Sequence, residues 1–390
     1  MSTARAAQTP VIGVVAGEPS GDLLGAAVLS ALRARVPALR FIGIGGPRMQ
    51  ASGLQPLFPM EKLAVRGYVE VLRHYREITS IRRRLRRFLL DQRPDVFLGI
   101  DAPDFNLGLE ASLKARGIPT VHYVSPSIWA WRGERIHKIR RAVSRMLTVF
   151  PFEAPLYEKA GVPVSYVGHP LADMLPDQPD RAAAREQLRL PRSGTVIALL
   201  PGSRVSEVEQ MAGLFVRTAA EIAGRMAEAV FLVPLVNRET RTIFEQALYR
   251  HTDPPLRMHL LFGHAHEAMT AADAVLVASG TATLEAALLK RPMVITYTMS
   301  RLAWWVLKDK GYLPYYGLPN ILAGQFVVPE LLQHDATPEN LAQALTNTLT
   351  DTTVLARLER IFSAIHHQLR RGSAERAADA VLELAGRGRP

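Results

Sequence analysis

A loop between a strand and a helix carries the first residues whose types suggest chemistry. The apolar run Val196–Leu200 predicts a buried strand, and a helical pattern begins a few residues later. Between them, Gly202 permits close approach of a ligand to the backbone, Ser203 is a candidate N-cap, and Arg204 carries a permanent charge suited to phosphate. Glu207 in the first turn also suits a helix N-terminus, where backbone N–H groups bind anions. We interpret this loop as a diphosphate site; the alternative is an ordinary strand–turn–helix connection capped by Ser203.

A second loop of the same kind follows the predicted strand 274–278. Ser279, Gly280 and Thr281 form a small-residue turn that opens a helix, which repeats the anion-binding pattern of the first loop. Glu285 lies about one turn inside that helix, where its carboxylate can accept hydrogen bonds from ribose hydroxyls. Capping by Ser279 or Thr281 is the alternative. Two such helix starts in one domain favour a ligand site at both.

A carboxylate stands at the end of another buried strand. The continuous apolar run Val96–Ile100 is typical of a parallel strand, and it delivers Asp101 at its carboxyl end. Open α/β sheets bind ligands at that edge, so Asp101 is a candidate general base. For Asp104, an N-cap role before the helix predicted over 105–116 is the better interpretation.

Two series of strands and helices must position these residues. Continuous apolar strands alternate with helical segments on both sides of the segment Leu171–Asp180, which is rich in proline and aspartate and predicts a linker. This alternation predicts an α/β protein with two doubly wound, parallel-sheet domains that face a cleft. We expect the domains to span residues 1–170 and 171–390.

The composition limits the classes of partner. The chain has 390 residues, 48% of them hydrophobic, and no cysteine, which excludes disulfides and thiolate metal sites. The formal net charge of +11 favours anionic partners: nucleic acid, phosphate-bearing substrates or an anionic membrane face. No apolar run approaches the length of a spanning helix, and Met1–Thr9 has no signal core, so we expect a soluble or peripheral protein of the cytosol.

An apolar patch lies directly before an arginine-rich helix. This combination is typical of a segment that lies in a membrane interface, although a core helix with a solvated basic face is the alternative. The candidate membrane-facing residues are Val65, Val69, Val71, Leu72, Arg73 and Arg76.

Six stretches of the chain, in order, resemble the lipid-A-disaccharide synthase family, which consists of inverting glycosyltransferases of the GT-B type. The resemblance covers nearly the whole chain, and its longer motifs are specific. The matching stretches are Ala16–Asp22, Gly99–Asn106, His122–Trp131, Leu200–Arg204, Ala278–Thr281 and Leu318–Asn320.

The resemblance implies a reaction. UDP-2,3-diacylglucosamine donates its sugar to 2,3-diacylglucosamine 1-phosphate (lipid X), which gives a β-1,6-linked disaccharide 1-phosphate and UDP. It also implies that Asp101 is the base, that no metal or other cofactor takes part, and that the enzyme meets its lipid substrates at an anionic membrane surface, the cytoplasmic face of the inner membrane. In this fold the last helix commonly returns to the N-terminal domain, so we expect part of 361–384 to do so. Family members can form dimers by exchanging C-terminal domains, and the oligomeric state stays open.

On this basis the site residues fall into two groups. The N-terminal domain is expected to bind the acceptor through Glu18, Ser20, Gly21, Asp22, Ser125 and Trp129. The C-terminal domain is expected to bind UDP through Gly202, Ser203, Arg204, Glu207, Ser279, Gly280, Thr281, Glu285 and Asn320. The alternatives are another UDP-sugar enzyme of the GT-B type, such as an epimerase or a lipid-linked GlcNAc transferase, and a nucleic-acid-binding protein. The latter is disfavoured, because the tryptophans lie apart from the main arginine cluster.

Overall fold

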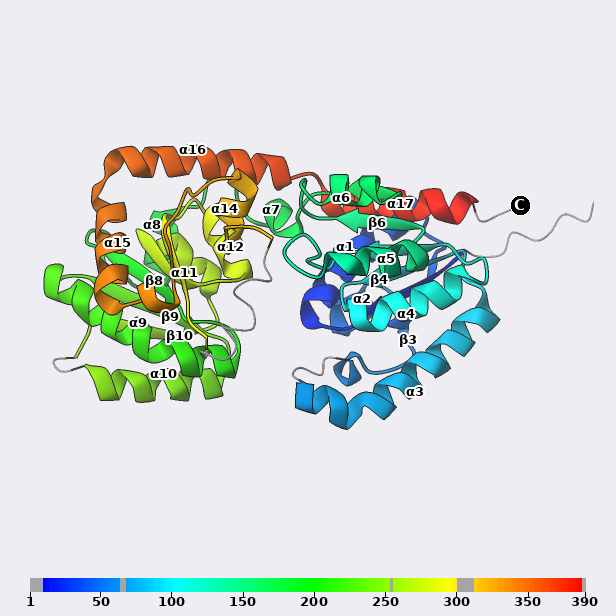
Figure 1. Ribbon diagram of the computed structural model, residues 1–390, viewed down its shortest axis with the longest axis horizontal. Helices are drawn as coiled ribbons and strands as arrows, with labels where there is room; N and C mark the ends of the chain where they lie inside the picture. Colours follow the sequence, from blue (N-terminus) through cyan, green and yellow to red (C-terminus); the bar gives the residue numbers. More distant parts are fainter. Residues whose placement is uncertain (1–9, 64–67, 253–254, 300–311, 388–390) are drawn as a thin grey trace, which may run out of the picture. The chain divides into compact units, whose positions relative to one another are not determined.

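The chain folds into two compact units. The structure, a computed structural model, describes residues 10–63, 68–252, 255–299 and 312–387. One unit comprises Met1–Asp173 together with Leu369–Pro390, and the other comprises Met174–Gln368. Each contains a parallel sheet layered between helices (Figure 1), so the predicted doubly wound α/β architecture is confirmed.

The first unit is built on a seven-stranded parallel sheet. Its strands are β1 (Val11–Ala16), β2 (Arg40–Ile44), β3 (Leu54–Pro56), β4 (Val96–Ile100), β5 (Thr120–Tyr123), β6 (Arg145–Thr148) and β7 (Val164–Tyr166). They lie in the order β3-β2-β1-β4-β5-β6-β7. The order changes direction between β1 and β4, where Ala16 and Ile100 are register partners. Ligands bind in open α/β sheets at such a switch point, outside the carboxyl ends of the strands.

The helices of the first unit include the C-terminal one. They are α1 (Pro19–Arg35), α2 (Pro47–Ala51), α3 (Tyr68–Gln92), α4 (Pro103–Lys114), α5 (Ile136–Ala142), α6 (Ala154–Lys159), α7 (Pro170–Met174) and α17 (Ser373–Arg387), with short 3₁₀ turns at Met60–Lys62 and Gly133–Arg135. Helix α17 lies beside α1, where Arg35 Nε is 2.8 Å from Asp379 Oδ1. The Asp173 carboxylate accepts hydrogen bonds from the backbone N–H groups of Gly372 and Ser373 at 2.9 and 2.7 Å. These contacts anchor the end of the chain in the first unit.

The second unit has a six-stranded parallel sheet. Its strands are β8 (Val196–Leu200), β9 (Val230–Leu235), β10 (Met258–Phe262), β11 (Ala274–Ala278), β12 (Met293–Tyr297) and β13 (Glu330–Leu332), in the order β10-β9-β8-β11-β12-β13. The order changes direction between β8 and β11. The two loops predicted to bind anions follow these two strands, so the switch point of this sheet brings them to one edge.

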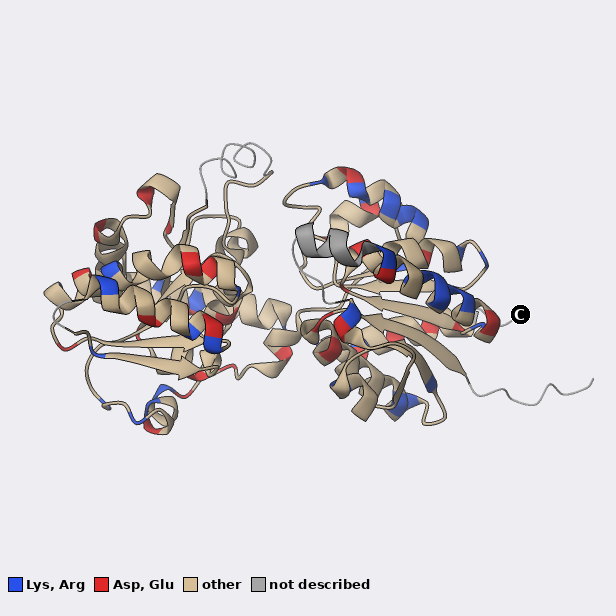
Figure 2. Cartoon of the chain, turned by 90° about the horizontal axis from the view of Figure 1, so that it is seen from below, with Lys and Arg blue, Asp and Glu red and all other residues tan. Residues whose placement is uncertain are grey.

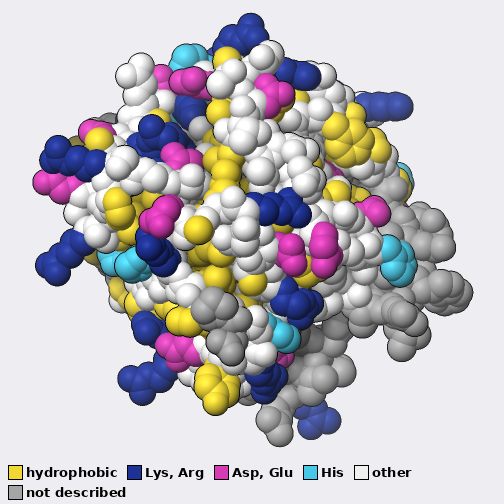
Figure 3. Space-filling model, turned by 90° about the vertical axis from the view of Figure 1, so that its left-hand side faces the viewer, with side chains coloured by type: hydrophobic (Ala, Val, Ile, Leu, Met, Phe, Trp, Pro, Cys, Tyr) yellow, Lys and Arg dark blue, Asp and Glu magenta, His cyan; other side chains and the backbone are white. Residues whose placement is uncertain are grey.

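Helices complete the second unit. They are α8 (Arg181–Gln187), α9 (Val205–Arg225), α10 (Arg238–His251), α11 (Ala265–Ala271), α12 (Thr281–Leu288), α14 (Leu318–Ala323), α15 (Pro338–Thr350) and α16 (Thr352–Leu369), with a 3₁₀ turn at Gln333–Asp335. Helix α9 buries Met211, Phe215 and Ile222 in the same core cluster as Ile197 of β8 and Phe231 of β9. On the face of the molecule drawn in Figure 3, basic and acidic side chains are interspersed and do not form a patch of one sign.

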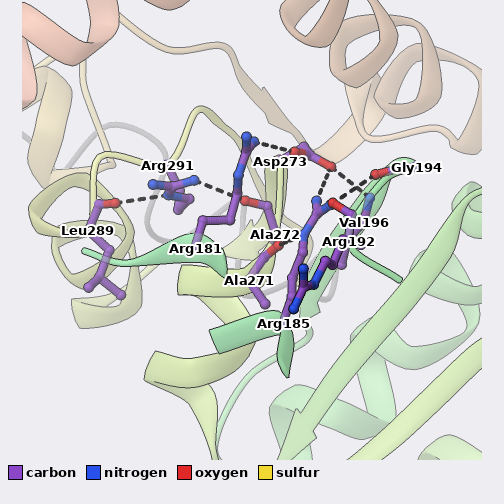
Figure 4. A network of polar contacts seen from close by, with 10 residues as sticks. All are labelled: Arg181, Arg185, Arg192, Gly194, Val196, Ala271, Ala272, Asp273, Leu289 and Arg291. Carbon is purple, nitrogen blue, oxygen red and sulfur yellow. Dashed lines mark hydrogen bonds and ion pairs between the residues drawn. The ribbon is translucent and has the colours of Figure 1, made fainter. Parts of the chain in front are cut away.

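A polar network fastens the amino edge of this second sheet (Figure 4). The Asp273 carboxylate accepts from Arg185 Nη2 at 2.7 Å and from the Val196 backbone N–H at 2.8 Å, and it pairs with Arg181 at 2.7 Å. Arg185 also donates from Nε to the Ala271 carbonyl at 3.0 Å. Because the network ties α8 to the starts of β8 and β11, it holds the edge opposite the predicted ligand loops.

Candidate active site

Asp101 is held in a constrained turn at the carboxyl edge of the first sheet. Its backbone N–H donates to the Tyr123 carbonyl at 2.9 Å, and its carbonyl accepts from Asn106 Nδ2 at 2.8 Å. Asp101 and Ala102 have φ values of 50° and 44°, in the left-handed region that non-glycine residues rarely adopt. Two successive residues of this kind cost free energy, and such strain gathers at functional sites.

The surroundings of Asp101 suit a carboxylate that takes up a proton. Burial raises the pKa of Asp101 above its ordinary value of 3.8, and the nearby Glu18 carboxylate raises the pKa further. A hydrogen bond from the Ala102 backbone and the charge of His122 act in the opposite direction. The net effect is a raised pKa, which makes Asp101 a stronger base than an exposed aspartate.

A buried histidine–glutamate pair lies beside this turn. His122 Nδ1 is 2.7 Å from Glu110 Oε1, and both side chains are 0% exposed. Gly99 leaves room for the pair, because a Cβ at that position would lie 2.1 Å from Glu110 Oε1. Glu110 could not be singled out from the sequence, since its partner is on another element. Because the His122 side chain is fully buried, it has no surface with which to contact a substrate.

A pocket of about 300 Å³ opens next to Asp101 within the first unit. Ser125, one of the predicted acceptor residues, lines it together with Trp131, Arg132 and Arg135. Trp129, also predicted, packs edge-on against Phe152, with ring centroids 5.1 Å apart. The tryptophan in the pocket wall is therefore Trp131, two residues further along the chain.

A second buried carboxylate interacts with Ser125, one of the residues that line this pocket. Glu153 is 1% exposed, and its Oε2 accepts from the backbone N–H groups of Val149 and Phe150 at 3.1 and 2.9 Å. Burial raises the pKa of Glu153 to about 7, although hydrogen bonds from Ser125 and Trp129 act against that rise. Sequence reasoning missed Glu153, because nothing in its local pattern predicts burial.

The loop after β1 places its predicted residues in different roles. Glu18 is half-buried at the N-cap position of α1, and Ser20 is exposed. Gly21 is buried where a Cβ would lie 3.3 Å from the Ala16 Cβ, so its small size lets α1 approach β1. The Asp22 carboxylate is 3% exposed and accepts from the backbone N–H groups at the start of α2, those of Arg48 and Met49, at 3.1 and 3.0 Å. Asp22 thus joins two helices, and its role in acceptor binding stays a prediction.

Two predicted helix caps are wrong. The N-cap of α9 is Arg204 and not Ser203, and the Glu207 carboxylate accepts from the backbone N–H groups of Ser203 and Arg204 at 3.1 and 3.2 Å. Glu207 Oε1 also pairs with Arg204 Nη1 at 2.8 Å. Helix α4 begins at Pro103 after an Ala102 N-cap, so Asp104 lies in the first turn and pairs with Arg135 at 3.2 Å.

The loop after β11 leads directly into helix α12, as its small-residue pattern predicts. Gly280 is the N-cap of α12, with a φ of 150° and no side-chain cap, so neither Ser279 nor Thr281 caps the helix. Gly280 and Thr281 are exposed at the helix start. Glu285, one turn inside, lies 3.1 Å from His266 Nε2, and this partner raises the pKa of His266 above its ordinary value.

Asn320 is fully buried and fixes a neighbouring loop. Its Oδ1 accepts from the backbone N–H groups of Val327 and Val328 at 2.8 and 3.0 Å, and its Nδ2 donates to Glu330 Oε1 at 2.7 Å. Glu330 Oε2 in turn accepts from the Tyr316 backbone N–H at 2.9 Å. The polar side-chain atoms of Asn320 are thus engaged within the protein. Through Glu330, Asn320 is a positioning residue for the loop that contains Tyr316.

A pocket of about 230 Å³ in the second unit joins several predicted UDP-binding residues. Arg204 at the end of the loop after β8 and Glu207 in the first turn of α9 line it. Ser279 lines it from the loop after β11, and Tyr297 and Tyr316 complete the wall. Gly202 precedes this wall with a φ of 132°, where a Cβ would lie 2.6 Å from the Glu207 Cβ. A glycine is therefore required for the loop to pack against α9.

The predicted membrane residues lie at the start of α3 and just before it. Val65 is outside the described residues, Val69, Val71, Leu72 and Arg73 lie in helical turns whose side chains are not described, and Arg76 is exposed. Basic residues follow along the rest of α3 (Figure 2), among them the exposed residues Arg83, Arg84 and Arg87. No helix in the described part of the chain is long and apolar enough to cross a membrane. Within the same residues, no cluster of three histidine or acidic side chains could hold a metal ion.

Comparison with known proteins identifies the family. Residues 12–383 match the family described as lipid-A-disaccharide synthetase. The chain belongs to the lipid-A-disaccharide synthase family. The lipid-A-disaccharide synthase of Methylobacillus flagellatus is 59% identical over 375 residues, which cover 96% of this chain and 99% of that protein. The enzyme of Azoarcus sp. (strain BH72) is 58% identical over 373 residues, 96% of this chain and 95% of that one. The resemblance found in the motifs is thereby confirmed.

Solved structures agree on the fold. The glycotransferase of kitacinnamycin aligns with a TM-score of 0.62 at 16% identity and covers 97% of this chain and 100% of its own. The UDP-GlcNAc 2-epimerase of Neisseria meningitidis, solved with UDP-GlcNAc, aligns with a TM-score of 0.61 at 13% identity over 96% of this chain and 100% of its own. HepE of Anabaena, solved with UDP and glucose, aligns with a TM-score of 0.56 at 12% identity over 96% of this chain and 100% of its own. The chain is a glycosyltransferase with the GT-B fold of two Rossmann-like domains, as expected.

Proposed function

We propose that this family member transfers 2,3-diacylglucosamine from its UDP derivative to 2,3-diacylglucosamine 1-phosphate, and that Asp101 is the general base. The observation that carries the proposal is the half-buried, strained position of Asp101 at the switch point of the first sheet, where partial burial and Glu18 raise the pKa of the carboxyl. A raised pKa suits a group that must accept a proton from an alcohol near neutral pH.

The proposed chemistry is a single displacement. Asp101 takes the proton from the 6-hydroxyl of the acceptor while that oxygen bonds to the anomeric carbon of the donor. The bond from that carbon to the diphosphate oxygen breaks, the configuration inverts to β, and UDP leaves with the bonding electron pair. Arg204 and the N-terminal N–H groups of α9 and α12 stabilise the charge that develops on UDP. No metal or other cofactor is needed for this step.

The two units divide the substrates between them in this proposal. Residues 1–170 bind the acceptor and approach the membrane, and residues 171–390 bind the UDP-sugar, apart from the terminal helices in about 361–384. Neighbours solved with UDP or a UDP-sugar support the nature of the donor. Both substrates carry acyl chains, so we expect peripheral association with the cytoplasmic face of the inner membrane, through the start of α3 and its arginines.

The test is product analysis with one inactive variant. The purified protein is incubated with both substrates in EDTA, and mass spectrometry looks for the disaccharide 1-phosphate. Asp101→Asn should lower turnover by about 10²-fold or more, the usual scale for a general base, while UDP affinity stays unchanged. Near-normal turnover of Asp101→Asn would refute the assignment of the base. Conversion of UDP-GlcNAc to its 2-epimer in a separate incubation, detected by chromatography, together with no disaccharide in the first, would favour an epimerase.

A further inference from the structure

The pocket beside Asp101 contains two cations that the proposed displacement does not use. Arg132 and Arg135 line it, one just before and one at the end of the 3₁₀ turn Gly133–Arg135. All of its lining residues belong to the first unit. The pocket thus combines a candidate base with two guanidinium groups.

The backbone around this pocket is strained at several points. Val124 and Arg132 line the pocket with φ values of 76° and 56°, and Asp101 lines it with a φ of 50°. A positive φ is most unfavourable for a β-branched residue such as Val124. Strain of this kind persists where it places side chains that a relaxed loop would not place. Here it turns the strand ends of β4 and β5 and the start of the 3₁₀ turn toward a common space.

The two arginines are held in ways that leave their charge available. The Arg132 guanidinium stacks on the Trp131 ring, with its Cζ 4.1 Å from the ring centroid. Stacking fixes the plane of the fork without neutralising it. Among the described residues, the acid that pairs with Arg135 is Asp104, at 3.2 Å, and its side chain is 82% exposed. An exposed pair of this kind is weak, so an incoming anion can replace Asp104.

We propose that Arg132 and Arg135 bind the phosphate monoester of the acceptor, a glycosyl 1-phosphate, and thereby position its hydroxyl for Asp101. This inference rests on the proposed function and adds a subsite to it. A phosphate dianion matches two guanidinium forks, which form charge-assisted hydrogen bonds to its oxygens. The volume of about 300 Å³ is at the lower end of the range of ligand pockets, about 300–1,000 Å³. It suits a sugar phosphate headgroup, with the acyl chains outside.

The charge balance of the pocket supports the same ligand. Asp101 contributes a carboxylate, and the two arginines contribute two cations, so the lining is net positive. The acceptor is an anion at one position of its ring and neutral at the attacking hydroxyl. The acceptor is therefore complementary to the pocket when its phosphate lies at the arginines and its hydroxyl lies at the Asp101 carboxylate. In the opposite orientation the phosphate would lie against Asp101, and the two negative charges would repel each other.

The test compares acceptors with and without the phosphate. Arg132→Ala and Arg135→Ala are assayed with 2,3-diacylglucosamine 1-phosphate and with dephosphorylated 2,3-diacylglucosamine, and Arg141→Ala, an exposed arginine of α5, is the matched control. We expect each pocket variant to raise the KM for the phosphorylated acceptor about tenfold or more, the scale of one charge-assisted hydrogen bond. The KM for the donor and the rate with the dephosphorylated acceptor should not change. Variants that keep the preference of the wild type for the phosphorylated acceptor would overturn the proposal.

A binding measurement separates this inference from the proposed function. Calorimetry with glucosamine 1-phosphate, in the absence of donor, requires no turnover. Binding that is lost in Arg132→Ala, weakened in Arg132→Lys and retained in Asp101→Asn supports the subsite, even if the wild type forms no disaccharide and the proposed function fails. Disaccharide formation together with unchanged acceptor kinetics in both arginine variants would refute the subsite and leave the proposed function standing. Melting temperatures equal to that of Arg141→Ala would show that the variants are folded.

Discussion

The buried carboxyl of Glu153 should make the stability of the first unit depend on pH. Its pKa rises from 4.5 to about 7 on folding, because burial penalises the charged form. One pKa unit corresponds to about 1.36 kcal/mol, so keeping this group ionised in the folded state costs up to about 3 kcal/mol. The folded state binds the proton more tightly than the unfolded state. Stability from this group is therefore complete below pH 4.5 and is lost as the pH rises to about 7.

Glu153→Gln removes the charge and keeps the shape. The amide oxygen can still accept from the backbone N–H groups of Val149 and Phe150. At pH 8 the variant should be more stable than the wild type by up to about 3 kcal/mol. The cost of replacing the hydrogen bonds that Ser125 and Trp129 make to the carboxylate reduces this gain. Near pH 4.5 the two proteins should be equally stable.

Calorimetric unfolding at a series of pH values measures the effect. Glu158→Gln, an exposed neighbour on α6, is the control and should follow the wild type at each pH. A wild type whose stability does not fall between pH 5 and 7, or a Glu153→Gln variant that is less stable than the wild type at pH 8, would refute the reasoning. Either result would mean that the hydrogen bonds to Glu153 outweigh its burial.

Three further changes test the two sites and the scaffold. Arg204→Ala should weaken UDP binding about tenfold or more in calorimetry, because one charge-assisted hydrogen bond is lost; unchanged affinity would remove Arg204 from the site. In urea unfolding, Arg185→Ala should destabilise the second unit by about 3 kcal/mol, because it breaks a buried charge network. Arg181 pairs with the same Asp273 carboxylate but is half-exposed, so Arg181→Ala should cost at most about 1 kcal/mol. Equal losses in the two variants would contradict this account. Glu18→Gln should move the acid limb of the pH–rate profile to lower pH, because the Glu18 charge raises the pKa of Asp101; an unmoved limb would mean that another group sets it.

The fold could be predicted because buried parallel strands leave a plain mark in the sequence. The continuous apolar runs at 96–100 and 196–200 coincide with β4 and β8. A strand covered on both faces needs apolar side chains at every position, and that pattern requires no knowledge of its neighbours. The position of Asp101 at the carboxyl edge followed from the same pattern, since the residue after such a strand lies at the edge where ligands bind.

The buried polar residues could not be predicted in the same way. Glu110 lies on helix α4 and His122 on the strand that follows it, β5, and only the packing of these two elements shows that the residues form a pair. Glu153 and Asn320 likewise gain their roles from backbone groups that the fold brings to them. From the sequence alone, a polar side chain is expected to be exposed to solvent. Its burial becomes evident only when the fold shows its hydrogen-bond partners.

The wrongly predicted N-caps show that the local sequence pattern does not always decide where a helix begins. Ser203 has the side chain preferred at an N-cap, yet α9 starts one residue later, at an Arg204 N-cap. The side chain of an N-cap serine accepts from N–H groups two or three residues further on, whereas the Glu207 carboxylate accepts from the Ser203 and Arg204 N–H groups themselves. These N–H groups therefore already bind an anion, one supplied by the chain itself. A diphosphate at this loop has to compete with the Glu207 carboxylate for the same donors, so the affinity for UDP measures the difference between two anions rather than the strength of one contact.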